Sequence, residues 1–395
     1  MRPELSVVSS PLPREAGARN EPLRRRLRVA DVALFYGARG GGIHTYLEAK
    51  AAFARRTRAF EHHLVFPGRP GSPGMPLDEF RHEQPSLRLA ASNGYRIPLG
   101  GSGLQTTLRE LAPDVVLLHD PFWTPRVACR AAHELGALVI AVHHAGPALN
   151  GASIPGPQEL YRAALRRWYR RAYLEVDAVM SVVDTGPDSR RSSTLPLRLG
   201  LDPAFGPWAR DEVGEPSDHV LYAGRLSREK GVRELLEAAA AAPQPWPLRL
   251  LGTGPAGDML RDRAQALGLG DRVTFAPYVS DRRELAREYA RARCVVQPGP
   301  HETFGLVSFE AAACGASVVT ASCTPSAELI RGSVETFEAG DAADLLRAIE
   351  RARRRNPGRQ AAARLAAQHS WDAALSAELA DLELLVARPG GPLVA

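Results

Sequence analysis

The stretch CVVQPGPHETFGLVSFEAAACGASVVTAS, residues 294–322, has an apolar run at each end and a run of small residues between them. The runs CVVQP and SVVTAS are typical of buried strands, and VSFEAAACG predicts a closely packed helix. Two parallel strands joined by a helix form a βαβ unit. The stretch therefore predicts an α/β fold, and it places two carboxylates, Glu302 and Glu310, where a buried strand turns into a buried helix.

The same alternation of strands and helices fills the rest of the chain in two sets. A segment rich in Pro, Gly and acidic residues, 196–218, separates the sets and predicts a linker. We expect an α/β fold of two Rossmann-like domains that face each other across a deep cleft. The expected parts are a flexible leader over 1–27, an N-terminal domain over 28–200, a C-terminal domain over 201–370, and a C-terminal helix over 371–395 that packs back on the N-terminal domain.

Composition limits the class of protein. No apolar run approaches the 18 residues that a membrane span needs, and the N-terminus has no apolar signal-peptide core. The four cysteines have neither metal-site nor disulfide-framework spacing, so we expect buried thiols in the reducing cytoplasm. Residues 1–200 hold 27 basic against 18 acidic residues, whereas residues 201–395 are slightly acidic. A basic first half favours an anionic partner such as a membrane surface or an acidic acceptor.

The segment AGRLSREKG, residues 223–231, follows the first strand of the second set. Gly224 allows a sharp turn, and Arg225 and Lys230 supply a planar fork and a mobile point charge that together suit a diphosphate. Lys230 is one of only two lysines in the chain, the other being Lys50. A solvated charged loop is the alternative interpretation.

The segment HETFGLVSFE, residues 301–310, predicts a helix that begins near Gly305 with its free N–H groups directed at the same sheet edge. A carboxylate accepts two hydrogen bonds side by side, which is the pattern that a vicinal diol offers. Glu302 and Glu310 around an anion-binding helix end therefore predict a nucleotide-sugar site. The alternative is a helix with favourable acidic residues near its N-terminus.

The segment GTGPAG, residues 252–257, matches the GxGxxG pattern of dinucleotide-binding loops. Pro255 stands where the helix should begin, and the pattern lies in the second strand–helix unit of its domain instead of the first. We expect a tight turn here, on the phosphate side of the site or purely structural.

These motifs, in this order, resemble the C-terminal half of family 4 glycosyltransferases of the GT-B fold. The resemblance rests on AGRLSREKG, LGTGP, HETFGLVSFEAAACGASVV, PSAELI and HSWD, and the two glutamates match that family's E-x7-E motif. It covers about residues 28–385 and is strongest over 219–330. It implies a retaining, metal-independent hexosyltransferase that uses a nucleoside diphosphate sugar, linked to GDP or UDP, as donor. Two departures are Ser317, where the family usually has Pro, and LRLGLDP in place of its PNG-x-D loop.

The resemblance also implies roles for single residues around the donor diphosphate. Arg225 and Lys230 would hold the diphosphate and stabilise it as it leaves. The backbone amides of Phe304, Gly305 and Leu306 would cap the same phosphates.

The remaining implied roles concern the sugar, the ribose and the acceptor. Glu310 would bind the ribose hydroxyls and Glu302 the hydroxyls of the transferred sugar. In the N-terminal half, Gly41 and Gly42 would let the backbone approach donor and acceptor. His143 would lie near the reacting centre, since it aligns better than its neighbour in AVHHAG.

Retention without an evident nucleophile suggests front-face substitution, with catalysis coming largely from stabilisation of the departing diphosphate. The chain has no D-x-D triplet that would bind a metal–diphosphate complex. We therefore expect no metal and no cofactor.

The segment YRAALRRWYRRAY, residues 161–173, predicts a basic helix with interleaved aromatic residues. Such a helix can lie on an anionic membrane surface, or it can be a solvated helix with its aromatic residues in the core. The basic residues concerned are Arg162, Arg166, Arg167, Arg170 and Arg171. No nucleic-acid-binding motif accompanies the charge, so we expect no nucleic-acid partner.

The leading hypothesis is a glycosyltransferase of bacterial envelope glycan or glycolipid synthesis, in the cytoplasm and in peripheral contact with the membrane if the helix binds lipid. A natural-product glycosyltransferase is the alternative. A sugar-nucleotide epimerase and a two-domain sugar-binding protein are weaker alternatives. An isomerised sugar nucleotide after incubation with the donor alone would identify the epimerase. Release of nucleoside diphosphate during turnover would exclude the binding protein.

Overall fold

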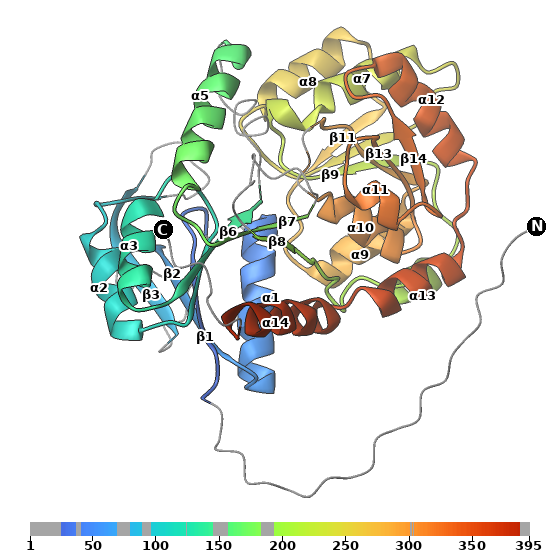
Figure 1. Ribbon diagram of the computed structural model, residues 1–395. Coiled ribbons are helices and arrows are strands. Elements are labelled where there is room, and N and C mark those ends of the chain that lie inside the picture. Colours follow the sequence, from blue (N-terminus) through green and yellow to red (C-terminus); the bar gives the residue numbers. More distant parts are fainter. Residues whose placement is uncertain are drawn as a thin grey trace, which may run out of the picture.

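The computed structural model describes residues 25–36, 41–68, 80–88, 96–123, 125–144, 157–182, 193–300, 302 and 304–387. Most of the expected leader, residues 1–24, lies outside this part of the chain. Two sheets, one parallel throughout and one parallel except at an edge strand, are each covered by helices and form two domains (Figure 1). The predicted pair of Rossmann-like α/β domains is therefore confirmed.

The N-terminal sheet is parallel except for its edge strand β4, which runs antiparallel to β3. Its strands, in sheet order, are β4 (Arg96–Pro98), β3 (Arg81–Arg88), β2 (Glu61–Gly68), β1 (Arg28–Val32), β5 (Val115–Leu118), β6 (Leu138–His143), β7 (Ala178–Ser181) and β8 (Ser193–Pro196). Its described helices are α1 (Gly42–Thr57), α2 (Ser102–Leu111), α3 (Pro125–Glu134) and α5 (Gln158–Ala172).

The C-terminal sheet is parallel throughout. Its strands, in sheet order, are β11 (Val273–Ala276), β10 (Leu248–Leu251), β9 (Val220–Ala223), β12 (Cys294–Gln297), β13 (Ser317–Ala321) and β14 (Val334–Phe337). The helices after β8 are α6 (Trp208–Val213), the 3-10 helix η1 (Arg228–Lys230), α7 (Val232–Ala241), α8 (Gly257–Ala266), α9 (Arg282–Arg291), α10 (Leu306–Ala313), α11 (Ser326–Leu329), α12 (Ala342–Arg353), α13 (Arg359–Gln368) and α14 (Trp371–Val386).

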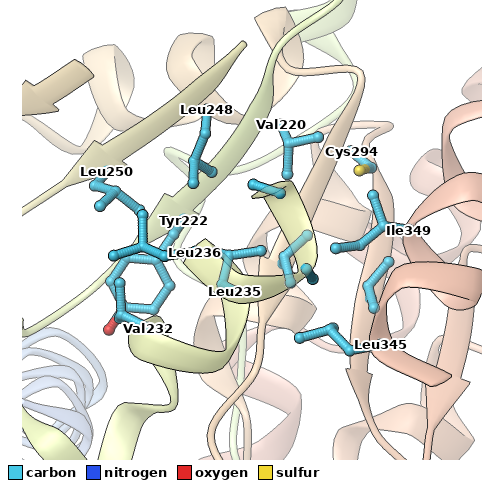
Figure 2. Packing of buried hydrophobic residues seen from close by; sticks show 14 of the residues in the cluster. Val220, Tyr222, Val232, Leu235, Leu236, Leu248, Leu250, Cys294, Leu345 and Ile349 are labelled. Atoms are coloured by element: carbon cyan, nitrogen blue, oxygen red, sulfur yellow. The ribbon is translucent and has the colours of Figure 1, made fainter. Parts of the chain in front are cut away.

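Each sheet has a buried apolar layer on both faces, as the continuous apolar strands require. On one face of the C-terminal sheet, side chains of β9 and β10 pack against α7 and α12 (Figure 2). Leu235 and Leu236 of α7 and Ile349 of α12 meet Val220 and Leu248 in this layer. The rigid core holds the loops at the carboxyl ends of the strands in place.

Strand order reverses at one place in each sheet. The neighbours at this switch point are β1 and β5 in the first sheet and β9 and β12 in the second. Loops that leave neighbouring strands in opposite directions open a crevice at the carboxyl ends of those strands, where open α/β sheets bind ligands. The candidate site should therefore lie after β9 and β12, facing the ends of β1 and β5.

The segment expected to be a linker is packed against other parts of the chain. The backbone N–H of Leu201 donates to His369 O at 2.7 Å, and a Cβ on Gly200 would lie 2.5 Å from the Trp371 backbone. Phe205 and Ala209 of the same segment are buried in the C-terminal core. The segment thus joins the two domains through contacts with the chain that enters α14.

Helix α14 returns from the C-terminal domain and lies against α1 (Figure 1). Its Trp371, Leu375, Leu382 and Leu385 belong to the core of the N-terminal domain. The end of the chain therefore contributes to the domain with which the chain begins.

One expectation about the cysteines is wrong. Cys129, Cys294 and Cys314 are buried thiols, but Cys323 is exposed. Cys323 follows the end of β13, in a turn at the sheet edge, so the apolar run before it does not continue to this position.

Candidate functional site

The loops that follow β9 and β12 touch through their backbones. Gly231 has φ = 67°, and a Cβ there would lie 2.7 Å from Pro298 O. A Cβ on Gly299 would lie 3.1 Å from Glu229 O. Glycine at both positions allows this approach, which brings the end of η1 beside the segment that leads to Glu302.

Lys230 and Glu302 form an ion pair across these two loops. The distance from Lys230 Nζ to Glu302 Oε1 is 2.5 Å, and the side chains are 26% and 15% exposed. The partial exposure leaves the pair accessible to a ligand. An ammonium and a carboxylate at one spot can bind an anionic group and a hydroxyl group side by side.

Arg225 begins the β9 loop with an exposed side chain. Its carbonyl accepts a 2.7 Å hydrogen bond from Tyr222 OH. No ion pair of its guanidinium occurs within the described part of the chain. The Arg225 guanidinium is therefore available to bind an anion, as predicted, while the Tyr222 hydrogen bond holds its backbone.

The loop GTGPAG supports the Arg225 loop. A Cβ on Gly252, where φ = 138°, would lie 2.0 Å from Gly224 O, and a Cβ on Gly254 would lie 2.2 Å from Leu226 O. Glycine at both positions therefore allows the backbones of the two loops to pack closely. This geometry agrees with the expected tight turn and gives no sign of a dinucleotide fingerprint.

Helix α10 begins at the edge where these loops meet. Its N-cap Gly305 has φ = 86°, and its first helical bond runs from Phe309 N–H to Gly305 O at 3.1 Å. The N–H groups of Leu306, Val307 and Ser308 therefore have no acceptor inside the helix. The Phe304 side chain is buried against the Phe309 ring, so only its backbone can serve a ligand.

The N-terminal domain meets the C-terminal domain at the start of α10. A Cβ on Gly42 would lie 3.4 Å from Leu306 Cδ1, whereas one on Gly41 would meet none of the described residues within 4 Å. Gly41 is the N-cap of α1 in an extended conformation. The starts of α1 and α10 thus face each other.

Glu310 lies on the second turn of α10. Tyr289 OH donates to its Oε2 at 3.3 Å. Burial raises the pKa of the Glu310 carboxyl to about 7, although the nearby Arg282 guanidinium and the Tyr289 hydrogen bond oppose the shift. The charge of Glu310 is therefore adjustable near neutral pH, which a sequence motif does not reveal.

His143 and His144 lie on opposite faces of the N-terminal sheet, because side chains alternate along a strand. His143 contacts the rings of Tyr169 and Tyr173, and its Nδ1 has no hydrogen-bond partner among the described residues. Burial lowers the pKa of its imidazole. His144 is buried on the face that α1 and α14 cover and lies 2.7 Å from His119.

Sequence reasoning missed a buried polar cluster, here called the Asp31 cluster, on the α1 and α14 face of the N-terminal sheet. Its members are Asp31, Tyr46, Lys50, His62, His119, His144 and Glu378. The distances from Asp31 are 2.7 Å to His62 Nε2, 2.6 Å to His119 Nε2 and 3.2 Å to Lys50 Nζ. Strand alternation places Asp31, His62, His119 and His144 on one face, and this signal could have revealed the cluster.

The Asp31 cluster holds two carboxylates around one ammonium. Lys50 Nζ lies 2.8 Å from Glu378 Oε1, and Tyr46 OH donates to Glu378 at 2.7 Å. Burial alone would raise the pKa of Asp31, but the Lys50 ammonium and the bonds from His119 and His62 hold it well below its usual range. Burial alone would likewise lower the pKa of Lys50, and the two carboxylates raise it.

Two further features bear on ligands. No group of three or more His, Cys, Asp or Glu residues suited to a metal ion occurs in the described ranges. In the same ranges, no helix is long and apolar enough to span a bilayer.

Helix α5 stands out from the N-terminal domain (Figure 1). Arg166, Arg167, Arg170 and Arg171 are exposed on it, and Arg162 is partly buried. Tyr169 and Tyr173 are buried in the core, while Trp168 is half exposed with its Nε1 donating to Pro121 O at 2.8 Å. The buried tyrosines and exposed arginines agree with the predicted solvated helix whose aromatic residues reach the core, and the membrane interpretation stays a prediction.

Comparisons with known proteins match both domains. Residues 40–185 match the family described as Glycosyltransferase Family 4, and residues 210–369 match Glycosyl transferases group 1. A GDP-mannose-dependent alpha-(1-6)-phosphatidylinositol dimannoside mannosyltransferase of Mycobacterium tuberculosis is 29% identical over 337 residues, which span 80% of this chain and 84% of that protein. A D-inositol 3-phosphate glycosyltransferase of Mycolicibacterium smegmatis is 36% identical over 52% of this chain and 50% of its own.

Solved structures share the fold over nearly the whole chain. Sucrose-phosphate synthase from Thermosynechococcus elongatus has a TM-score of 0.71 at 21% identity, covering 92% of this chain and 100% of its own. WaaG, described as a glycosyltransferase involved in lipopolysaccharide biosynthesis, has a TM-score of 0.62 at 17% identity. The match covers 90% of this chain and 99% of WaaG.

Proposed function

As a member of glycosyltransferase family 4, this chain is a glycosyltransferase of the GT-B fold, and we propose that it moves a hexose from a nucleoside diphosphate sugar to an acceptor hydroxyl with retention. The single observation that carries the proposal is the Lys230–Glu302 ion pair beside the start of α10. It lies where loops from both sides of a switch point meet an anion-binding helix end.

The donor diphosphate fits the positive groups of this edge. Arg225 and Lys230 offer charge-assisted hydrogen bonds, and the free N–H groups at the start of α10 supply a positive dipole end. When the phosphates bind, they replace Glu302 as the partner of Lys230. Glu302 is then available to the hydroxyls of the transferred sugar, so donor binding itself prepares the sugar site.

The departing diphosphate gains negative charge as its bond to the sugar breaks. Groups placed where charge develops stabilise the transition state most, and Arg225, Lys230 and the α10 amides are so placed. These cations do the work that a metal does in other transferases, so we propose that no metal takes part. Glu310 binds the ribose hydroxyls. His143 or His144 lies near the reacting carbon on the side of the N-terminal domain.

The relatives support a proposal for the donor base and the acceptor. The mycobacterial relative named above is GDP-mannose-dependent and acts on a phosphatidylinositol dimannoside. We propose a GDP- or UDP-hexose as donor and an envelope glycan or glycolipid as acceptor, with a natural product as the second candidate acceptor. A thermal-shift screen of UDP, GDP and dTDP sugars would identify the donor, because a bound donor raises the melting temperature.

Substitution of Lys230 tests the proposal. We expect Lys230→Ala to lose about a hundredfold or more in kcat, since it removes one preorganised charge from the leaving group. Arg228→Ala, in the same 3-10 helix and exposed, is the matched control and should keep its turnover. Assays are run with EDTA, which should not lower the wild-type rate. Full activity of Lys230→Ala in a folded protein would refute the role of this residue.

Helix α5 supports a second proposal, that the chain binds an anionic membrane surface. Besides its arginines, the helix and its end expose Leu160, Trp168 and Leu174, which are 64%, 51% and 68% exposed. Exposed apolar side chains among arginines suit the interface of an anionic bilayer, where a lipid-linked acceptor would be found.

Liposome co-sedimentation tests the membrane proposal. We expect binding to increase with anionic lipid content and Arg166→Glu/Arg170→Glu to lower it about thirtyfold or more, since each basic residue near the surface adds about 1 kcal/mol. The control Arg354→Glu/Arg364→Glu makes an equal change of net charge on the exposed surface of the C-terminal domain, and this variant should bind like wild type. Binding that does not depend on anionic lipid would contradict the proposal.

A further inference from the structure

The two cations proposed to hold the diphosphate are fixed in different ways. The Lys230 ammonium has a side-chain partner, since Glu302 Oε1 lies 2.5 Å from its Nζ. The Arg225 guanidinium has no ion-pair partner within the described ranges. The place of this guanidinium before a donor binds therefore depends on what holds the Arg225 backbone.

A buried side chain, Tyr222, holds that backbone directly. Its hydroxyl donates to the Arg225 carbonyl at 2.7 Å. The ring is fully buried and packs with Val232 and Leu236 of α7 in the core layer (Figure 2). Because a closely packed core keeps its side chains in place, the hydroxyl ties the Arg225 carbonyl to the rigid part of the domain.

Gly224 leaves room for the hydroxyl under the turn. It has φ = 155°, and a Cβ there would lie 2.9 Å from Tyr222 OH. The hydroxyl thus occupies space that a side chain at position 224 would need. Burial raises the pKa of Tyr222, and the carboxylates of Glu302 and Glu229 raise it further. The hydroxyl therefore stays protonated and remains a hydrogen-bond donor.

The other contacts of the turn do not replace this bond. Gln297 Nε2 donates to Ala223 O at 2.9 Å and so holds the end of β9. The Arg225 carbonyl also accepts from Ser227 N–H at 3.1 Å, but both groups belong to the same loop. Among the described residues, Tyr222 is thus the side chain that ties the Arg225 backbone to the core.

We propose that Tyr222 is a positioning residue for the transfer reaction and that it acts through Arg225. Its hydroxyl fixes the Arg225 backbone before the donor arrives, so the guanidinium is already in place where the departing diphosphate gathers charge. Without the hydroxyl, the same guanidinium is present but has to be ordered during the reaction, which weakens its effect. This inference rests on the proposed transferase function.

A double-mutant cycle between Tyr222 and Arg225 tests the proposal. Tyr222→Phe removes the hydroxyl and keeps the ring in the core. We expect it to lower kcat about tenfold in the wild-type chain but less than about twofold in Arg225→Ala, because no guanidinium is then left to position. An equal loss in both backgrounds would show that Tyr222 acts independently of Arg225. That result, or an unchanged kcat in the single variant Tyr222→Phe, would overturn the proposal.

Binding of GDP and UDP tests the same cycle without turnover. In titration calorimetry, Tyr222→Phe should raise the Kd of the bound nucleotide about threefold when Arg225 is present and leave it unchanged in Arg225→Ala. An equal increase in both backgrounds would overturn the positioning role alone. A wild-type chain that binds neither nucleotide and transfers no sugar would contradict the proposed function, and the positioning role with it.

Ser86→Ala is the matched control for loss of a buried hydroxyl. Ser86 Oγ donates to Gly68 O at 2.8 Å in the N-terminal sheet, and it also accepts from Arg96 Nε. Both Ser86→Ala and Tyr222→Phe should lower the melting temperature, since each removes a buried hydrogen bond. Only Tyr222→Phe should lose turnover. An equal loss of kcat in Ser86→Ala would trace the effect to stability and overturn the proposal.

Discussion

Glu310 shows how burial can make one carboxylate pH-sensitive. Its pKa of about 7 means that the donor-free protein loses this charge as the pH falls from 8 to 6. Since the ionised form accepts hydroxyl hydrogen bonds best, we expect the donor KM to rise about tenfold over this range. In Glu310→Gln the donor KM should be higher at pH 8 and nearly independent of pH. A wild-type KM that does not change between pH 8 and 6 would contradict the role of Glu310 in donor binding.

The same shift has a definite sign for stability. The pKa of Glu310 is higher in the folded chain than its ordinary value of 4.5, so the folded state binds more protons between pH 4.5 and 7. This residue therefore favours folding at low pH, and its contribution is lost as the pH rises through about 7. The favourable contribution of Glu310 is thus absent at the pH where its charge would serve the donor.

At the scale of the element, the start of α10 depends on one backbone conformation. Gly305 has φ = 86°, and a Cβ there would lie 2.5 Å from Ser326 Oγ and 2.7 Å from Thr324 Cγ2. We expect Gly305→Ala to lower the free energy of unfolding by about 1–3 kcal/mol and to raise the donor KM, because the helix end must shift. Urea denaturation and donor titration measure the two effects.

A glycine at the start of α8 provides the control for this helix end. Gly257 has no positive φ, and a Cβ there would make only ordinary contacts with the side chains of Arg261 at 3.5 Å and Leu226 at 3.9 Å. Gly257→Ala should therefore be neutral or slightly stabilising. If both substitutions had the same effect, the backbone conformation of Gly305 would not control this helix end.

At the scale of the whole molecule, the buried Lys50 holds α14 and the N-terminal sheet to one another. It lies between Asp31 of β1 and Glu378 of α14, with 1% of its side chain exposed. We expect Lys50→Met to lower the free energy of unfolding by about 3–5 kcal/mol, because it leaves two buried carboxylates without their cation. Denaturant unfolding followed by circular dichroism measures this loss.

Arg56 offers a matched comparison on the same two helices. It belongs to α1 and pairs with Asp372 of α14, but both side chains are more than half exposed. Arg56→Met should unfold like the wild type, since solvent screens an exposed pair. A similar loss from both substitutions would show that the contact between the helices, and not the buried charge, is what matters.

The extent of sequence prediction differs among these scales. Arg225, Lys230 and Glu302 could be placed at one sheet edge, since loops after neighbouring parallel strands must meet there. The ion pair between Lys230 and Glu302 could not be predicted from the sequence, because the distance between the two side chains depends on the backbone contact at Gly231. The edge strand β4 and the exposure of Cys323 also escaped prediction, as short or terminal segments have weak periodicity.

Residue order alone specified the α/β class, the two domains and the family, because strand and helix periodicity and loop motifs are local properties. The Asp31 cluster needed the folded chain. His119 and Glu378 are far in sequence from Asp31 and Lys50, and only the strand order and the return of α14 bring the four residues together. Burial then set their charges, since the pKa of a group follows its final surroundings and not its neighbours in the chain.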